Sequence, residues 1–241
     1  MCKHCMTMNR RSFFGASAGA ALGLAALGGA VLGGAVPAVA SAGTALTPDQ
    51  ALERLKAGNL KYQKAPDVCA ADMLKTRETV AKGQSPWAIV LACADSRVAP
   101  ELVFGGAGLG DLFVCRNAGN MADTATMGSI EYAVEHLGTP LIVVLGHERC
   151  GAVAAACEVA EKGTKLPGSI GPMVNAILPA ASAMRGKSGD FTDNVVRESA
   201  RRTALKIATD SPIVAEFVHG GKVKVAYGRY DLDSGAVDFL G

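Results

Sequence analysis

Two short segments of this 241-residue chain carry residues that can bind and use a metal ion. The first contains Cys93, Asp95 and Arg97, and the second contains His147 and Cys150. Two thiolates and one imidazole are ligands that zinc favours. A structural zinc site usually has four Cys or His ligands, whereas these segments offer three, and Asp95 is the nearest candidate for the fourth position. The pattern therefore predicts a catalytic zinc site whose fourth position can open.

Each segment follows a short apolar run, which places the candidate ligands at the ends of two strands. Residues 87–92 precede Cys93, and residues 141–146 precede His147. Continuous apolar runs of this length are typical of strands buried on both faces of a parallel sheet. Functional sites in such sheets lie beyond the carboxyl ends of the strands. Cys150 follows His147 by three residues, so both can face one metal at the start of a helix.

Asp95 and Arg97 are the candidate catalytic pair. Residues two positions apart do not face each other on a helix, so their pairing requires a loop. Arg97 would keep the Asp95 carboxylate ionised and oriented. The alternative interpretation is a structural salt bridge at the start of a helix.

These residues make the chain resemble the β-class carbonic anhydrases, whose pattern is Cys-x-Asp-x-Arg followed by His-x-x-Cys. Three further segments look like the first helix, the second strand and the closing hairpin of that family: residues 52–59, 110–119 and 224–235. The resemblance implies a lyase (carbonate dehydratase) that reversibly hydrates carbon dioxide to bicarbonate and a proton. It also implies one Zn²⁺ per chain, bound by Cys93, His147 and Cys150.

In this family Asp95 would have two roles. It can bind zinc and close the site, or it can pair with Arg97, leave the fourth position to water and orient the hydroxide. The resemblance also implies self-association to a dimer or a higher even oligomer. Two alternatives remain open: a hydrolase of carbon disulfide or carbonyl sulfide on the same scaffold, and a non-catalytic module that binds zinc or an anion. Asp95 and Arg97 argue against the second, because binding alone does not require them.

The rest of the chain predicts an α/β fold, with a mainly parallel central sheet flanked by helices and a C-terminal hairpin strand. Strands are predicted at residues 87–92, 112–116, 141–145, 222–230 and 236–240. Helices are predicted to start at residues 48, 100 and 212 and to cover about 124–137, 151–162, 170–184 and 192–209. Thr47, Pro48 and Gln50 have the types and spacing of a capping box with proline at the first helical position.

Residues 1–42 are typical of a twin-arginine export signal. Arg10 and Arg11 precede a long uncharged stretch rich in Gly, Ala and Leu, and small residues suited to cleavage occupy residues 38–42. We therefore expect export by the twin-arginine machinery to the periplasm or another extracytoplasmic compartment, which leaves a catalytic domain at residues 43–241. The competing interpretation is an uncleaved membrane anchor, since the stretch is long enough to span a bilayer.

The predicted mature domain has almost no net charge. Removal of the signal takes away Lys3, Arg10 and Arg11 and no acidic residue, so 21 basic and 22 acidic residues remain and the formal charge is −1. The sequence therefore offers no basic stripe for nucleic acid.

Three cysteines lie outside both the signal and the metal set. Cys115 falls in a predicted strand and Cys157 in an Ala-rich predicted helix, so we expect both to be small buried hydrophobic residues. Cys69 falls in a predicted loop, where its thiol could be exposed.

Overall fold

The computed structural model describes residues 43–72 and 77–241. The predicted export signal and the proposed cleavage sites lie outside the described residues, so the boundary at residue 43 stays a prediction. Among the described residues, no helix combines the length and the apolar character that crossing a membrane requires.

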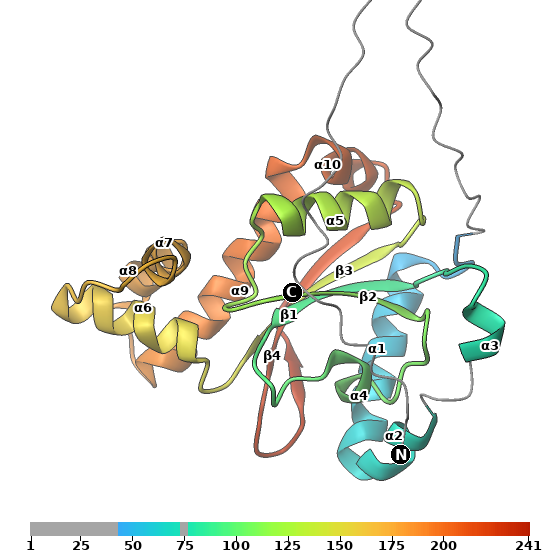
Figure 1. Ribbon diagram of the computed structural model, residues 1–241, viewed down its shortest axis with the longest axis horizontal. Helices are drawn as coiled ribbons and strands as arrows, with labels where there is room; N and C mark the ends of the chain where they lie inside the picture. Colours follow the sequence, from blue (N-terminus) through green and yellow to red (C-terminus); the bar gives the residue numbers. More distant parts are fainter. Residues whose placement is uncertain (1–42, 73–76) are drawn as a thin grey trace, which may run out of the picture. The chain divides into compact units, whose positions relative to one another are not determined.

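A five-stranded sheet in the order β2-β1-β3-β4-β5 forms the centre of the fold (Figure 1). The strands are β1 (Ala88–Cys93), β2 (Leu112–Asn117), β3 (Leu141–His147), β4 (Lys224–Tyr230) and β5 (Val237–Phe239). Strands β1 to β4 are parallel, and β5 pairs antiparallel with β4. This sheet confirms the predicted fold class.

Helices connect the strands and extend the fold beyond the sheet. They are α1 (Pro48–Lys64), α2 (Pro66–Asp72), α3 (Arg77–Val80), α4 (Pro100–Val103), α5 (Thr124–Glu135), α6 (Gly151–Lys162), α7 (Ile170–Asn175), α8 (Leu178–Met184), α9 (Phe191–Asp210) and α10 (Pro212–His219). Every residue of β1 and β3 is buried, as the continuous apolar runs predict for strands covered on both faces.

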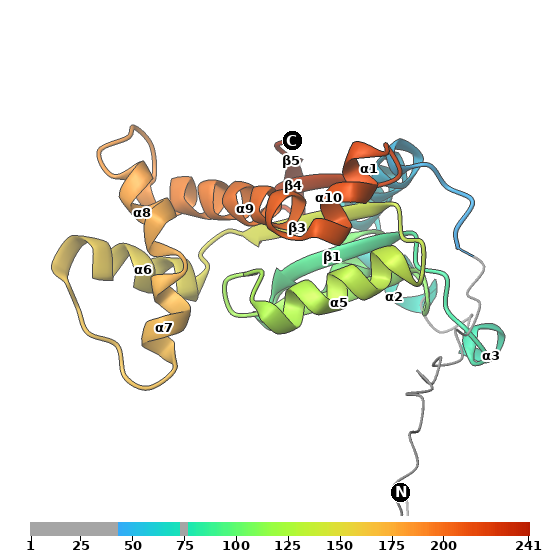
Figure 2. The same cartoon turned by 90° about the horizontal axis from the view of Figure 1, so that it is seen from above.

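The sheet has a helical layer on each face. Buried residues of α1 and α4 pack on one face, and buried residues of α5, α9 and α10 pack on the other. A third apolar cluster includes Cys93 and Cys150 and is built by α6, α7, α8 and the beginning of α9. Figure 2 shows α6, α7 and α8 grouped beyond one end of the sheet. The metal-ligand candidates therefore lie between the sheet and this separate helical cluster.

Helix α1 is fixed at both ends by hydrogen bonds. At its start Thr47 and Gln50 form the predicted capping box. Near its end the buried Asn59 side chain donates to the carbonyl oxygens of Val103 (3.0 Å) and Gly235 (2.8 Å). One amide thus ties α1 to α4 and to the C-terminal hairpin.

The structure corrects the prediction for Cys69. This residue lies in α2 and is fully buried, not exposed in a loop. Helix α2 packs against α1 and α4. The backbone of Gly106 also lies so close to Cys69 that a Cβ on Gly106 would collide with the Cys69 carbonyl. Helices α2 and α3 are short and have no strong apolar period, and the sequence analysis did not predict either of them.

The predicted helix at residues 170–184 is in fact two short helices, α7 and α8. Pro179 stands near the start of α8. Proline has no N–H to donate to the preceding turn and its ring crowds that turn, which breaks a helix but is tolerated in a first turn.

The other cysteine predictions are confirmed, since Cys115 and Cys157 are both buried.

We predict that Gly58→Ala destabilises the protein although Gly58 is helical. A Cβ at this position would collide with the carbonyl oxygen of Phe104, and overpacking of this kind typically costs about 1–3 kcal/mol. Gly128 in α5 is the matched control, because a Cβ there meets nothing within 4 Å. Gly128→Ala should stabilise by about 0.5–1 kcal/mol. Urea unfolding of both variants measures the difference, and equal effects of the same sign would contradict the packing argument.

Candidate metal centre

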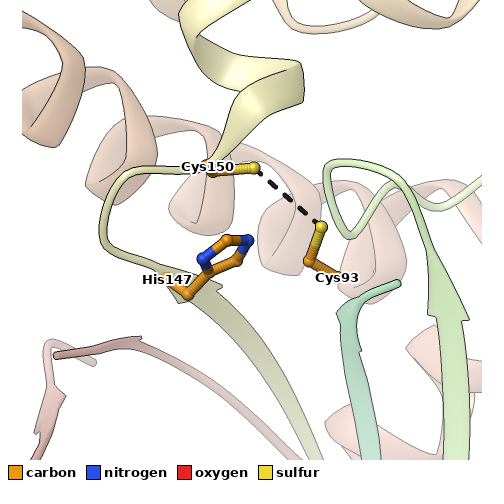
Figure 3. A group of neighbouring side chains, drawn as sticks. All are labelled: Cys93, His147 and Cys150. Atoms are coloured by element: carbon orange, nitrogen blue, oxygen red, sulfur yellow. Dashed lines mark hydrogen bonds between the residues drawn. The ribbon is translucent and has the colours of Figure 1, made fainter. Parts of the chain in front are cut away.

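Three side chains from separate elements converge at the carboxyl end of the sheet (Figure 3). Cys93 is the last residue of β1, His147 is the last residue of β3, and Cys150 is the N-cap residue of α6. All three are buried, and their ligand atoms lie within 4.8 Å of one another. The two Sγ atoms are 3.9 Å apart. This is the group that the sequence predicts.

The surroundings of His147 show whether a metal ion fits this site. Its Nε2 atom is buried without a hydrogen-bond partner among the described residues. Its other ring nitrogen, Nδ1, lies 2.9 Å from the carbonyl oxygen of Glu148. A carbonyl accepts, so Nδ1 carries the proton and Nε2 presents a lone pair toward the cysteines. A buried lone pair beside two thiols is what a zinc ion requires.

The two thiols share a proton. The hydrogen bond from the Cys150 thiol, with help from the Gly119 N–H, lowers the pKa of Cys93. The same hydrogen bond and burial raise the pKa of Cys150 far above its usual value. Without a cation the site therefore favours one thiolate and one thiol. A bound dication would hold both as thiolates.

Asp95 and Arg97 are paired in the loop after β1. The Asp95 carboxylate accepts from Nε of Arg97 at 2.9 Å, from Nη2 at 2.7 Å and from the Arg97 backbone N–H at 2.9 Å. The Arg97 guanidinium therefore holds the pKa of this carboxyl well below its usual range. Asp95 Oδ2 lies 3.9 Å from Nε2 of His147, so the carboxylate sits beside the three-ligand group and faces Arg97.

Residues after β2 fix the loop that carries Cys93 and Asp95. The Arg116 guanidinium donates to the carbonyl oxygens of Cys93 at 3.0 Å and Asp95 at 2.6 Å. The Asn117 amide donates to the carbonyl oxygen of Met121 at 2.6 Å. Both residues therefore hold loops in place.

Gly119 is a site residue that the sequence analysis missed. Its N–H donates to Sγ of Cys93 at 3.4 Å. Its φ is +83°, and a Cβ would lie 2.8 Å from Cδ1 of Ile177. Its place three residues after the predicted second strand is the signal that could have pointed to it.

Other histidines and acidic residues lie away from the three-ligand group or are paired with arginines. His136 and His219 are exposed at the ends of α5 and α10, as expected for solvated residues. Glu148, Asp231 and Asp233 form a second acidic group. Arg149 and Arg229 already contact these carboxylates, so the group is not a metal site.

Comparison with known proteins shows the family to which the chain belongs. The family model described as carbonic anhydrase matches residues 88–237, which include all the candidate ligands. The chain belongs to the carbonic anhydrase family. Zinc is the cofactor of the β class of this family, and the Cys93, His147 and Cys150 group is positioned to bind one metal ion.

Two curated relatives are similar over most of their length. The chain is 37% identical over 188 residues to carbonic anhydrase 2 of Mycobacterium tuberculosis, covering 78% of this chain and 90% of the relative. It is 34% identical over 191 residues to a carbonic anhydrase of Mycolicibacterium smegmatis, covering 79% and 92%.

Solved structures place the fold in the β class. A Coccomyxa β-carbonic anhydrase, in complex with acetazolamide, is 30% identical with a TM-score of 0.60, covering 74% of this chain and 82% of that one. A β-carbonic anhydrase of Aspergillus fumigatus is 29% identical with a TM-score of 0.61, covering 76% and 89%. The resemblance to β-class carbonic anhydrases that the two motifs predict is therefore confirmed.

Proposed function

We propose that this chain catalyses the reversible hydration of carbon dioxide to bicarbonate and a proton, with one zinc held by Cys93, His147 and Cys150. The buried, unpartnered Nε2 of His147 beside the two thiols is the observation that carries the proposal. A zinc ion held there would make water a nucleophile near neutral pH, because a bound zinc ion lowers the pKa of its water by several units.

Asp95 orients the nucleophile, and Arg97 positions Asp95. The Asp95 carboxylate stays ionised because Arg97 donates two side-chain hydrogen bonds to it. Ionised, it can only accept hydrogen bonds, so it can hold the attacking oxygen with a lone pair free for carbon dioxide. Both carboxylate oxygens already accept hydrogen bonds from Arg97, which would keep Asp95 from binding the metal itself. Two further contacts, from Arg116 and from the Arg97 backbone N–H, hold the loop in this conformation.

The Asp95–Arg97 pair also argues against one of the two alternatives. A module that only binds zinc or an anion has no need for a carboxylate oriented beside the metal, so the dyad favours an enzyme. A hydrolase of carbon disulfide or carbonyl sulfide would use the same metal group and differ in substrate access. Assays with those substrates beside carbon dioxide distinguish it.

We further propose that the protein works as a dimer or a higher even oligomer. Strand β2 is an edge of the sheet and is only partly buried, and an edge strand presents unpaired backbone groups to a partner. A similar structure, 25% identical with a TM-score of 0.60, is described as a tetrameric β-carbonic anhydrase of Sordaria macrospora.

Export by the twin-arginine route, followed by cleavage near residue 42, is the proposed origin of the mature domain. The support is Arg10 and Arg11 ahead of the uncharged stretch. This route carries folded proteins, which suits a site of two thiols 3.9 Å apart. Zinc bound before export would protect them from capture as a disulfide in an oxidising compartment.

Substitutions of Asp95 and Arg97 test the proposed catalytic mechanism. Asp95→Ala should keep zinc and lose on the order of 100-fold in hydration rate, because the nucleophile is no longer oriented. Arg97→Ala should also keep zinc and lose activity, because the unpaired Asp95 carboxylate would take the fourth position. Zinc content and hydration rate across pH are the measurements.

Arg201→Ala is the matched control, since Arg201 forms an exposed ion pair with Glu198 on α9. Its rate should equal that of the wild type. If both dyad variants also keep the wild-type rate, the pair is only structural and the proposed mechanism is wrong.

Export has its own test. Replacing Arg10 and Arg11 together by lysine should leave uncleaved precursor in the cytoplasm, because the signal depends on the arginine pair. Fractionation and immunoblotting of both forms measure this. Unchanged export of the double variant would instead point to the general secretory route or to a membrane anchor.

A further inference from the structure

The four-residue turn from His147 to Cys150 is held from outside by a network of charges. Its centre is Arg229, near the end of β4, whose side chain is only 11% exposed. The guanidinium contacts three carboxylates: Nε donates to Asp193 at 2.7 Å, Nη1 donates to Asp231 at 2.6 Å, and Nη2 lies 3.5 Å from Glu148. These residues come from α9, from the loop after β4 and from the turn itself.

Every polar group of Glu148 has a hydrogen-bonding or charged partner. Its backbone N–H donates to the carbonyl oxygen of Tyr230 at 2.9 Å. Its side chain accepts from the backbone N–H of Leu232 at 3.2 Å and from Nη1 of Arg149 at 3.3 Å, and it contacts Arg229 at 3.5 Å. Its carbonyl oxygen lies 2.9 Å from Nδ1 of His147. The orientation of this carbonyl decides which way the imidazole turns and which nitrogen carries the proton.

Arg149 links the same network to the catalytic pair. Its φ is +51°, a left-handed conformation that is costly for a residue with a side chain. Two hydrogen bonds to Asp233, at 2.9 and 2.7 Å, hold its side chain. Its carbonyl oxygen accepts from Nη2 of Arg97 at 3.3 Å. A turn in this conformation persists because the surrounding contacts determine it.

We propose that Arg229 and Glu148 are positioning residues of the zinc site. Arg229 holds the Glu148 side chain, and Glu148 in turn presents its carbonyl to Nδ1 of His147, so that Nε2 faces the two cysteines. The inference rests on the proposed function, since it assigns the outer support of the same metal centre. Partners that orient a metal-ligating histidine typically contribute 10–100-fold in metal affinity.

Arg229→Met and Glu148→Gln test the proposal. Methionine keeps much of the length of Arg229 without its charge, and glutamine keeps an acceptor for Leu232 without the charge that Arg229 contacts. Both variants should bind zinc about 10-fold more weakly in competition with a chelator. With Co²⁺ in place of zinc, both should show an altered visible absorption spectrum, because the imidazole is no longer held in one orientation.

Arg229→Lys should restore the zinc affinity only in part. An ammonium keeps the positive charge, but it lacks the planar fork with which the guanidinium donates to Asp193 and Asp231 and contacts Glu148 at the same time. Arg201→Met is the matched control, because it removes an arginine ion pair on α9 that does not touch the turn. Its zinc affinity and Co²⁺ spectrum should equal those of the wild type.

Urea unfolding separates positioning from stability. A purely structural role would lower the stability of the variants and leave zinc affinity and the Co²⁺ spectrum of the folded protein unchanged, and that result overturns the proposal. If Arg229→Met does not fold, the Glu148→Gln result decides. If the wild type binds no zinc, the proposed function fails. If the wild type binds zinc and hydrates carbon dioxide but the variants match it in metal binding, only this inference fails.

Discussion

The structure depends on burying two thiols and an imidazole next to one another at the carboxyl ends of two strands. Cys93, His147 and Cys150 are each at most 5% exposed, and Nε2 of His147 has no partner among the described residues. Burying an unpaired polar atom costs free energy, and so does burying a thiolate without a cation. A zinc ion removes both costs at once. The binding free energy of the metal therefore offsets a site that is unfavourable without it.

The parallel sheet brings the three ligand residues together. Neighbouring parallel strands end at the same edge, so the last residues of β1 and β3 meet without any long loop. Strand β2 on one side supplies Arg116 and the following Gly119, which hold the backbone and the thiol of Cys93. Strand β4 on the other side supplies Arg229 and the hairpin that hold the turn after His147. Each ligand strand thus has its own supporting neighbour, and the helical cluster of α6, α7 and α8 covers the site.

The parts of this arrangement that follow local rules could be predicted from the sequence. The apolar runs before Cys93 and His147 specify two buried strands, and the capping box at Thr47 specifies the start of α1. The ligand set follows from residue type and position at the ends of these strands. The state of Asp95 was left open by the sequence, and the described loop pairs it with Arg97.

Features that depend on long-range contacts were not predictable in the same way. Cys69 is buried where α2 packs against α1 and α4 and the backbone of Gly106 approaches closely, and nothing near Cys69 in the sequence indicates this. The three carboxylates around Arg229 are also distant from one another in sequence, and only the sheet order brings them together. Such contacts arise only in the tertiary fold. The periodicity of apolar residues in the sequence carries no information about them.

The most direct test of the central claim is the zinc content of the purified domain measured together with its rate of carbon dioxide hydration, for the wild type and for Cys150→Ser. The account predicts one zinc per chain and catalysed hydration for the wild type. It predicts loss of both for Cys150→Ser, because the remaining two ligands hold the metal poorly. A Cys150→Ser protein that is metal-free and fully active would contradict it.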